Sequence, residues 1–184
     1  MSWKNLVELD KRLTAKLRLG PEHNARWKAA AFLAHSGDSW FWVAGLILVW
    51  LLNTEPVWHN RAAMIAVAVV GLAVLVLAIK FLVRRQRPEG EWGAIYRATD
   101  PHSFPSGHAA RAMLLAVMAC GLGPWWLAAL LVIWMPFVSL SRVNTGLHYV
   151  SDVVVGAALG LVCGILALQL QPLVMQWFPF LFTV

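Results

Sequence analysis

The stretch SRVNTGLHYVSD, residues 141–152, is a polar segment between two long apolar runs. Within it, Asp152 carries the only side-chain carboxylate after Asp100, and nearly every residue beyond it is apolar. An ionisable side chain in apolar surroundings is energetically expensive, so we expect it to have a partner and a function. His148 lies four residues earlier, which places both side chains on one face of a helix. The carboxylate would then fix the tautomer of the imidazole, raise its basicity and stabilise its protonated form.

The composition of the whole chain is typical of a membrane protein. Of its 184 residues, 60% are hydrophobic and only 13% are charged, whereas soluble domains are nearer half apolar and a quarter charged. Several apolar runs approach the roughly 20 residues that a helix needs to cross a bilayer. We therefore predict a single all-α domain, residues 1–184, folded as a polytopic membrane helix bundle.

About five transmembrane helices are expected, preceded by an amphipathic helix that lies in the membrane interface. Residues 2–19 place leucines on one side and lysines and arginines around them, which is the period of a helix with a basic polar face. A solvated helix without membrane contact is the alternative for this segment. The expected spans are about 36–52, 62–83, 107–122, 125–140 and 148–170, and the apolar tail 172–184 leaves a sixth span open.

Along the last expected span, Gly156, Gly160 and Gly164 recur every four residues. Small residues at this spacing allow a second helix to approach closely. We therefore expect a packing face here, which would hold the helix that carries Asp152.

The net charge of +6 indicates a membrane surface rather than nucleic acid as the partner of the basic residues. Seven of the fifteen lysines and arginines fall within the first 28 residues, where they would meet anionic lipid headgroups. By the positive-inside rule these residues belong in the cytoplasm, and a site two crossings later would face the cytoplasm too. An interfacial basic helix can evade that rule, so both orientations in the cell (inner) membrane stay open.

Three polar segments flank the expected spans. They are KFLVRRQRP at 80–88, PSGH at 105–108 and the stretch at 141–152. Counting the crossings between them places all three on the same side of the membrane, whichever side that is. We therefore expect their side chains to form one site.

The residue types in these segments suit a phosphate group. Lys80, Arg87 and Arg142 supply three cations, and guanidinium groups match the geometry of phosphate oxygens. Ser106 offers a hydroxyl, and Gly107 would let the backbone approach a ligand at the start of a helix. The free N–H groups of a helix N-terminus form an anion site. We therefore predict that the three segments together form one phosphate-binding site.

Two histidines complete the set, and only one of them is backed by a carboxylate. That asymmetry favours a division of labour between a nucleophile and an acid. His148, oriented by Asp152, would attack phosphorus. His108 would protonate the departing oxygen and then activate water to release the phosphohistidine.

These segments resemble the motifs of the type 2 phosphatidic acid phosphatase (PAP2) family. K-x6-R-P, P-S-G-H and S-R-x5-H-x3-D occur in order and with matching internal spacing. The resemblance implies a metal-independent lipid phosphatase without a cofactor, in which His148 is the nucleophile, Asp152 orients it and His108 is the acid. Many bacterial members of the family have six spans, where we count five. The phosphate ligands that the resemblance implies are Lys80, Arg87, Ser106, Gly107 and Arg142.

Other polar residues near these segments are expected to play no part in the chemistry. Arg84 and Arg85 are typical topology signals, and Arg111 could contact a headgroup or pair with loop groups. His102 is expected to be a loop residue. A metal would need several histidine or carboxylate ligands, and only one acid is expected near the histidines. The histidines expected at the surface or the interface are His23, His35 and His59.

Two rival functions stay open from the sequence. A vanadium-dependent haloperoxidase uses a similar anion pocket, although the five spans and the small size argue against it. A non-catalytic carrier of phospholipid headgroups would need the cations but not a His–Asp pair plus a second histidine. The substrate is open among polyprenyl diphosphate, phosphatidate, phosphatidylglycerol phosphate, a lipid A phosphate and a polyprenyl phospho-sugar, and so is the oligomeric state.

Overall fold

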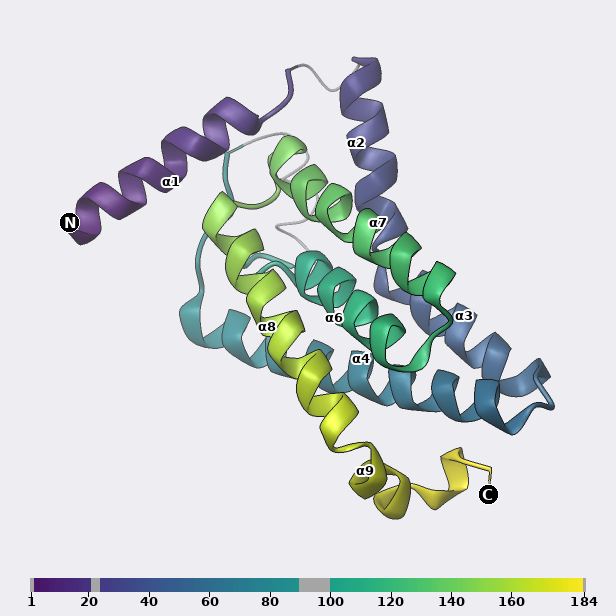
Figure 1. The fold of residues 1–184 in the computed structure, drawn as a ribbon. Helices are drawn as coiled ribbons and strands as arrows, with labels where there is room; N and C mark the ends of the chain where they lie inside the picture. The colour runs from purple at the N-terminus through teal and green to yellow at the C-terminus, as the bar shows by residue number, and fades with distance from the viewer. Residues whose placement is uncertain (1, 21–23, 90–99, 184) are drawn as a thin grey trace.

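The structure of the protein is a computed structural model that describes residues 2–20, 24–89 and 100–183. The described chain is helical, as predicted, and its elements follow one another around a central helix (Figure 1). These elements are α1 (Trp3–Leu17), α2 (Ala25–Ser36), α3 (Ser39–Leu52), α4 (Pro56–Val83), α6 (Gly107–Leu122), α7 (Trp125–Asn144), α8 (Val150–Gln169), α9 (Gln171–Trp177) and the 3-10 turn η1 (Pro179–Leu181).

Three helices, α4, α7 and α8, are long and apolar enough to cross a membrane. The first expected span is not one continuous helix, because α2 and α3 break at Gly37–Asp38 and bend by 44°, although together they are long enough to cross. The third expected span, α6, is apolar but has only 16 residues. Each of the five predicted spans therefore has a helical counterpart, with the first one bent and the third one short.

The C-terminal tail does not form a sixth long helix in the part of the chain that the structure describes. It makes the short α9 and η1 and then returns to the end of the bundle where α3 meets α4. The indole Nε1 of Trp50 donates to the carbonyl of Leu181 at 2.9 Å. Asn60 exchanges two hydrogen bonds with the backbone of Thr183, both at 2.8 Å. The tail thus closes the far end of the bundle.

Helix α6 lies at the centre of the bundle, against α4, α7 and α8 (Figure 1). The predicted glycine face of α8 packs on it. A Cβ atom built on Gly156 would lie 2.5 Å from the carbonyl oxygen of Ser106, and one on Gly160 would lie 2.0 Å from that of Ala110. The two backbones therefore touch where α6 begins, which fixes the motif residues of one helix relative to those of the other.

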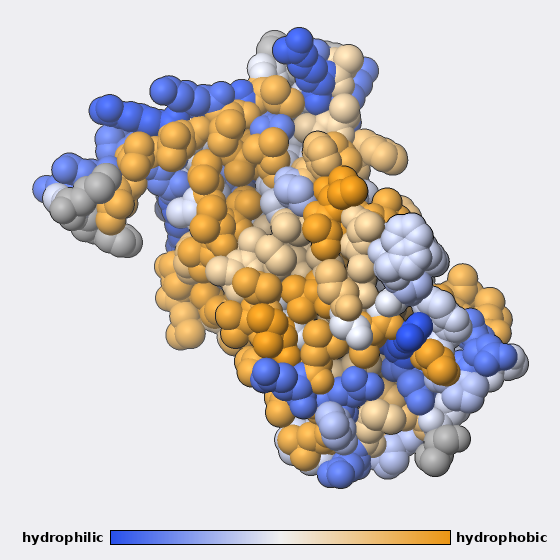
Figure 2. All heavy atoms as spheres, in the orientation of Figure 1, coloured by the Kyte–Doolittle hydropathy of each residue, from blue (hydrophilic) through white to orange (hydrophobic). Residues whose placement is uncertain are grey.

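Large apolar side chains cover the outside of the bundle. Helix α3 has no buried residue among those described, whereas the residues of α6 are mostly buried. Figure 2 shows apolar side chains over the middle of the molecule and polar ones over α1 and the start of α2. An apolar exterior of this kind is solvated by lipid, so the fold is that of a membrane protein.

Candidate functional site

The three polar segments meet at one end of the bundle. Helix α4 ends at Val83 and is capped by Arg84, whose backbone is left-handed (φ 51°). The chain that follows pairs with the chain before α6, since the N–H of Ser103 donates to the carbonyl of Arg85 at 2.8 Å. The N–H of Ser106 donates to the carbonyl of Asp152 at 2.9 Å. The predicted convergence of the three segments is therefore confirmed.

The predicted phosphate cations are buried at this end. Lys80, Arg87 and Arg142 are each less exposed than one tenth. One amino group of Arg87 donates to the carbonyl of Leu147 at 2.9 Å and lies 3.2 Å from Nε2 of His148. The guanidinium thus contacts the ring nitrogen that faces away from Asp152.

A carboxylate that the sequence did not single out neutralises two of these cations. Oδ2 of Asp100 accepts a hydrogen bond from Arg87 at 2.8 Å and forms an ion pair with Lys80. The backbone carbonyl of Asp100 accepts from Nε of Arg87 at 2.8 Å. A ligand with phosphate oxygens would therefore compete with Asp100 for the same donors.

The predicted range 148–170 placed His148 inside the last helix. In the structure His148 lies just before α8, which begins at Val150. Asp152 is the third residue of α8, and its Oδ2 accepts from the backbone N–H of Tyr149 at 2.9 Å, so the carboxylate caps the helix. This cap brings Oδ2 to 3.6 Å from Nδ1 of His148. The backbone of Ser103 also interacts with the ring of His148. The pair is therefore formed by cap geometry and not by a shared helix face.

Burial sets the protonation state of His148 more strongly than the nearby acid does. Desolvation, together with the charges of Arg142, Arg87 and Lys80, holds the pKa of His148 well below its usual range. The expectation that Asp152 raises the basicity of this ring is thus outweighed. His148 is neutral at neutral pH, and its Nε2 lone pair points toward Arg87.

His108 has an acid partner after all, and it comes from the break between α2 and α3. Nε2 of His108 lies 2.7 Å from Oδ1 of Asp38, and Nδ1 of His35 lies 3.0 Å from the other oxygen of that carboxylate. Gly37 lets the break pack closely, since a Cβ there would lie 2.8 Å from a side-chain atom of Val138 and 3.2 Å from the ring of His108. Arg111 donates to the carbonyl of Gly37 and closes the break. The sequence feature that could have indicated this partner is Asp38 itself, a carboxylate inside the first expected span.

Ser106 and Gly107 lie at the start of α6, as predicted. Oγ of Ser106 is buried, and no described group hydrogen-bonds it. A Cβ on Gly107 would meet only a side-chain atom of Val76, at an ordinary 3.5 Å. The protein's own packing therefore does not require a glycine here, whereas a ligand held against the backbone would.

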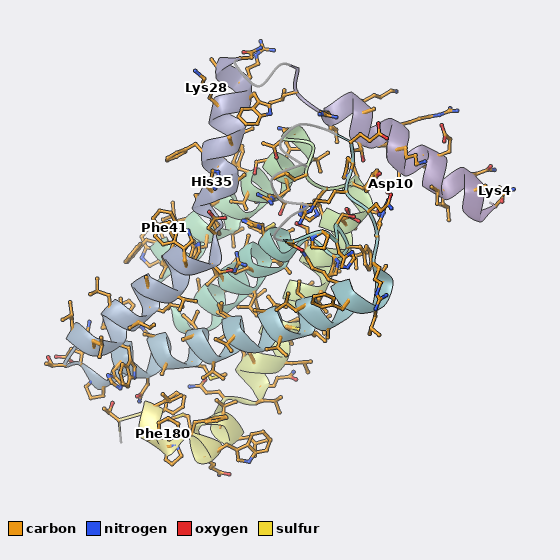
Figure 3. All side chains as sticks on the ribbon, turned by 180° about the vertical axis from the view of Figure 1, so that it is seen from behind. Lys4, Asp10, Lys28, His35, Phe41 and Phe180 are labelled. Carbon is orange, nitrogen blue, oxygen red and sulfur yellow. The ribbon has the colours of Figure 1, made fainter. Side chains whose placement is uncertain are left out.

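Several of these residues line a cavity of about 230 Å³. One end of the cavity is polar and the other is apolar. The polar end includes Lys80, Gly107, His108, Arg111, Arg142 and His148. The apolar end consists of α4 side chains, namely Val69, Leu72, Ala73, Val76 and Leu77. In Figure 3, which views the molecule from behind, Asp10 of α1 and His35 of α2 lie on opposite sides of the same end of the bundle.

The prediction of a single acid near the histidines is wrong, since Asp38, Asp100 and Asp10 also lie at this end of the bundle. Among the described residues, however, no group of three or more histidine, cysteine, aspartate or glutamate side chains is arranged to hold a metal ion. Arg85, expected to be only a topology signal, donates to Oδ1 of Asp152 at 2.7 Å. Reasoning from motif positions overlooked these residues because they lie outside the motifs or at variable positions within them.

The other residues set aside in the sequence are loop or surface groups. His102 pairs with Gln86 in an isolated β-bridge and packs its ring against Phe81, so it is a loop residue as predicted. The ring of His59 packs on Trp50 at 5.0 Å. His23, expected at the surface, lies outside the described residues.

Comparisons with known proteins agree on one family. The PAP2 superfamily matches residues 61–176. The decaprenylphosphoryl-5-phosphoribose phosphatase of Mycobacterium tuberculosis is 45% identical over 139 residues, which are 72% of this chain and 73% of that protein.

Two solved structures have a similar fold. The first transmembrane PAP2 type phosphatidylglycerolphosphate phosphatase from Bacillus subtilis matches with a TM-score of 0.73 at 19% identity, over 91% of this chain and 87% of that one. LpxE from Aquifex aeolicus matches with a TM-score of 0.67 at 25% identity, over 89% of this chain and 94% of that one. At 19% identity, the likeness to the Bacillus subtilis protein shows the fold alone.

Proposed function

The chain belongs to the PAP2 superfamily of membrane phosphatases, and we propose that it removes phosphate from a lipid phosphate monoester through a phosphohistidine formed on His148. The observation that carries this proposal is the cavity, because it joins buried cations and two histidines at one end to an apolar wall at the other. A phosphorylated lipid headgroup has the same two parts. No metal or cofactor takes part in the proposed reaction.

The first step is an in-line displacement at phosphorus. The Nε2 lone pair of His148 attacks, and the bond from phosphorus to the lipid oxygen breaks. Attack needs a neutral ring, and the lowered pKa of His148 supplies one. Asp152 stabilises the positive charge that develops on the ring, since its Oδ2 faces Nδ1.

His108 serves both halves of the reaction as acid and then as base. It donates a proton to the departing lipid oxygen, and the deprotonated ring then takes a proton from water. The water oxygen bonds to phosphorus as the bond to His148 breaks, which releases inorganic phosphate. A carboxylate in contact favours the protonated form of the ring, so Asp38 supports the acid role.

Charge on the three equatorial phosphate oxygens is stabilised by groups that are already in place. Lys80 and Arg142 are buried and line the cavity, and buried Arg87 contacts His148, so these cations interact strongly with charge that develops at phosphorus. The hydroxyl of Ser106 and the N-terminus of α6 at Gly107 add hydrogen-bond donors. Substrate phosphate displaces the Asp100 carboxylate from Lys80 and Arg87.

The substrate class that we propose is a polyprenyl-phosphoryl pentose carrying a terminal phosphate. The 45% identity to a decaprenylphosphoryl-5-phosphoribose phosphatase supports this choice over the other lipid phosphates. The apolar wall of α4 would lie along the part of the lipid nearest the headgroup. The enzyme would act in the cell membrane, where such lipids are dissolved.

A panel assay tests the substrate class. Phosphate release by the purified protein in detergent would be measured with five lipids: decaprenylphosphoryl-5-phosphoribose, undecaprenyl diphosphate, phosphatidylglycerol phosphate, lipid A 1-phosphate and phosphatidate. The phosphoribosyl lipid should give the highest kcat/KM, and EDTA should leave the rate unchanged. A higher kcat/KM on any other lipid would refute the proposed substrate, and strong inhibition by EDTA would refute the metal-independent mechanism.

Trapping tests the intermediate. Rapid acid-free quenching of the enzyme with a ³²P-labelled substrate should leave label on the protein that is stable in base and lost in acid, as expected for a phosphorus–nitrogen bond. Label that survives acid, or label of equal amount on a His148→Ala protein, would contradict a phosphohistidine at this position.

A further inference from the structure

Arg85 connects the proposed catalytic acid to the N-terminal helix. One amino group of its guanidinium donates to Oδ1 of Asp152 at 2.7 Å, and the other donates to Oδ2 of Asp10, on α1, also at 2.7 Å. The guanidinium lies over the ring of Tyr149, 4.0 Å from its centre. Arg85 thus has its two amino groups and one face engaged, and it is held between two carboxylates.

Helix α1 also caps the start of α8. Oδ1 of Asp10 accepts from the backbone N–H of Ser151 at 3.0 Å, and Oδ2 accepts from the hydroxyl of the same serine at 2.6 Å. Oγ1 of Thr14 accepts from the backbone N–H of Val150 at 3.1 Å. First-turn N–H groups have no partner within their own helix, and they are commonly capped by a neighbouring residue of the same chain segment. Here the caps come from a helix more than a hundred residues away.

The two oxygens of Asp152 have different partners. Oδ2 faces His148 and accepts from the N–H of Tyr149, whereas Oδ1 accepts from Arg85. The rotation of this carboxylate is therefore fixed by its own helix start, by a hydrogen bond with the side chain of Ser103 and by Arg85. Arg85 also donates to the hydroxyl of Ser151 at 2.7 Å. Without Asp10, Arg85 would lose one of its two carboxylate partners and that serine hydroxyl would lose its acceptor, so the guanidinium that holds Oδ1 would be less firmly placed.

Helix α1 lies with one face against α8 and another face exposed. Thr14 is buried against α8, while Leu6, Leu9, Leu13 and Leu17, on the adjacent face of the same helix, are 40–44% exposed. A leucine stripe of this kind inserts into the lipid interface. The backbone N–H of Leu19 donates to the carbonyl of Asn144 at 3.0 Å and attaches the end of α1 to the end of α7.

We propose that Asp10 is a positioning residue for the phosphatase reaction: through Arg85 and Ser151 it orients Asp152, and hence His148, for attack on phosphorus. The proposal rests on the proposed role of His148. It gives the N-terminal helix a part in the reaction, because the helix delivers one member of a four-residue chain that ends at the nucleophile.

The test compares Asp10→Asn with Glu8→Gln in the full-length protein in lipid nanodiscs. Glu8 is a matched control, because it lies on the same helix and, within the described residues, its only ion pair is with exposed Arg12, at 3.2 Å. Asp10→Asn should lower kcat about tenfold or more, the range found when an outer hydrogen-bond partner of an active-site group is removed. KM should stay within about twofold, since no phosphate ligand is changed. Glu8→Gln should leave both constants unchanged.

A double-mutant cycle shows whether Asp10 acts through Arg85. Asp10→Asn should have little further effect in an Arg85→Gln background, because removing either residue breaks the same chain. Asp10→Glu, which keeps the charge, should recover part of the lost kcat. Losses that multiply fully in the double variant would overturn the proposed path.

A structural role would give a different result. The burst of p-nitrophenol from p-nitrophenyl phosphate counts active sites, so kcat can be expressed per active enzyme. If Asp10→Asn lowers only the number of active sites and the unfolding temperature, and kcat per site is unchanged, the inference fails. It also fails if His148→Ala is inactive while Asp10→Asn keeps its full kcat. If His148→Ala itself keeps activity, the proposed function has failed first.

Discussion

The two histidines of the cavity are each paired with a carboxylate, but the two pairs are built in different ways. His148 and Asp152 lie four residues apart at the start of α8, and their nearest atoms are 3.6 Å apart. His108 and Asp38 lie seventy residues apart, on α6 and at the break between α2 and α3, and their nearest atoms are 2.7 Å apart. The pair that is distant in sequence is the closer one in space.

The difference follows from what each ring has to do in the proposed reaction. A nucleophile must be neutral before it attacks, and His148 is surrounded by buried cations while its acid is shared with Arg85 and a backbone N–H. His108 instead has a carboxylate oxygen of Asp38 in direct contact with its ring, and that partner can stabilise the ring while it carries the proton that the leaving oxygen needs. The two pairs thus differ in how closely the carboxylate approaches the ring and in which segment of the chain supplies it.

The largest effect is expected at the nucleophile. His148→Ala should lower phosphate release by about 10³-fold or more, because no other described side chain can take its place at phosphorus. The measurement is kcat on the phosphoribosyl lipid, with the unfolding temperature as a check on folding. A variant with full activity would show that the comparison assigns the wrong histidine to the attack.

His108→Gln should reduce kcat by about 10²- to 10⁴-fold on an alkyl phosphate, the usual contribution of a general acid. The first step on p-nitrophenyl phosphate should be affected much less, because that leaving group departs without a proton. Stopped-flow measurement of the p-nitrophenol burst separates the two steps. Equal losses with both leaving groups would be inconsistent with His108 as the acid.

Asp38→Asn should lower kcat about 10- to 100-fold, the usual effect of losing the partner of a catalytic ring. Its effect should disappear in a His108→Gln background, since Asp38 acts through that ring. Glu55→Gln is the matched control, because Glu55 is an exposed acid just beyond the other end of α3. If Asp38→Asn and Glu55→Gln lower the activity equally, Asp38 has no specific role in the reaction.

The smallest effect is expected at the close contact between α6 and α8, which positions the two histidine–carboxylate pairs relative to each other. Gly160→Ala would place a Cβ 2.0 Å from the backbone of Ala110, and overpacking of this kind destabilises a protein by about 1–3 kcal/mol. Gly71→Ala is the control, because a Cβ there meets nothing within 4 Å. Thermal unfolding in detergent should show a lower transition for Gly160→Ala only. If the two variants unfold at the same temperature, α8 does not depend on this close approach.

The sequence alone predicted the membrane bundle and the motif residues. Long apolar runs predict helices in lipid, since every backbone group must be hydrogen-bonded there within the helix. Counting those runs placed Lys80, His108 and His148 on one side, and the structure brings them to one cavity. These inferences depend only on local hydropathy, spacing and the order of the spans.

Four acidic or basic residues at the site were accessible only from the tertiary structure. Asp10, Asp38 and Asp100 belong to segments whose spacing from the motifs says nothing about distance in space, and Arg85 occupies a variable position inside the first motif. Whether a carboxylate meets a histidine or the solvent depends on how the helices pack, as the bend at Gly37 shows. The sequence by itself determined which side chains can handle a phosphate, because that chemistry belongs to the residues. Only the tertiary structure decided which acid is the partner of each histidine, because a buried charge takes its partner from whatever the fold places beside it.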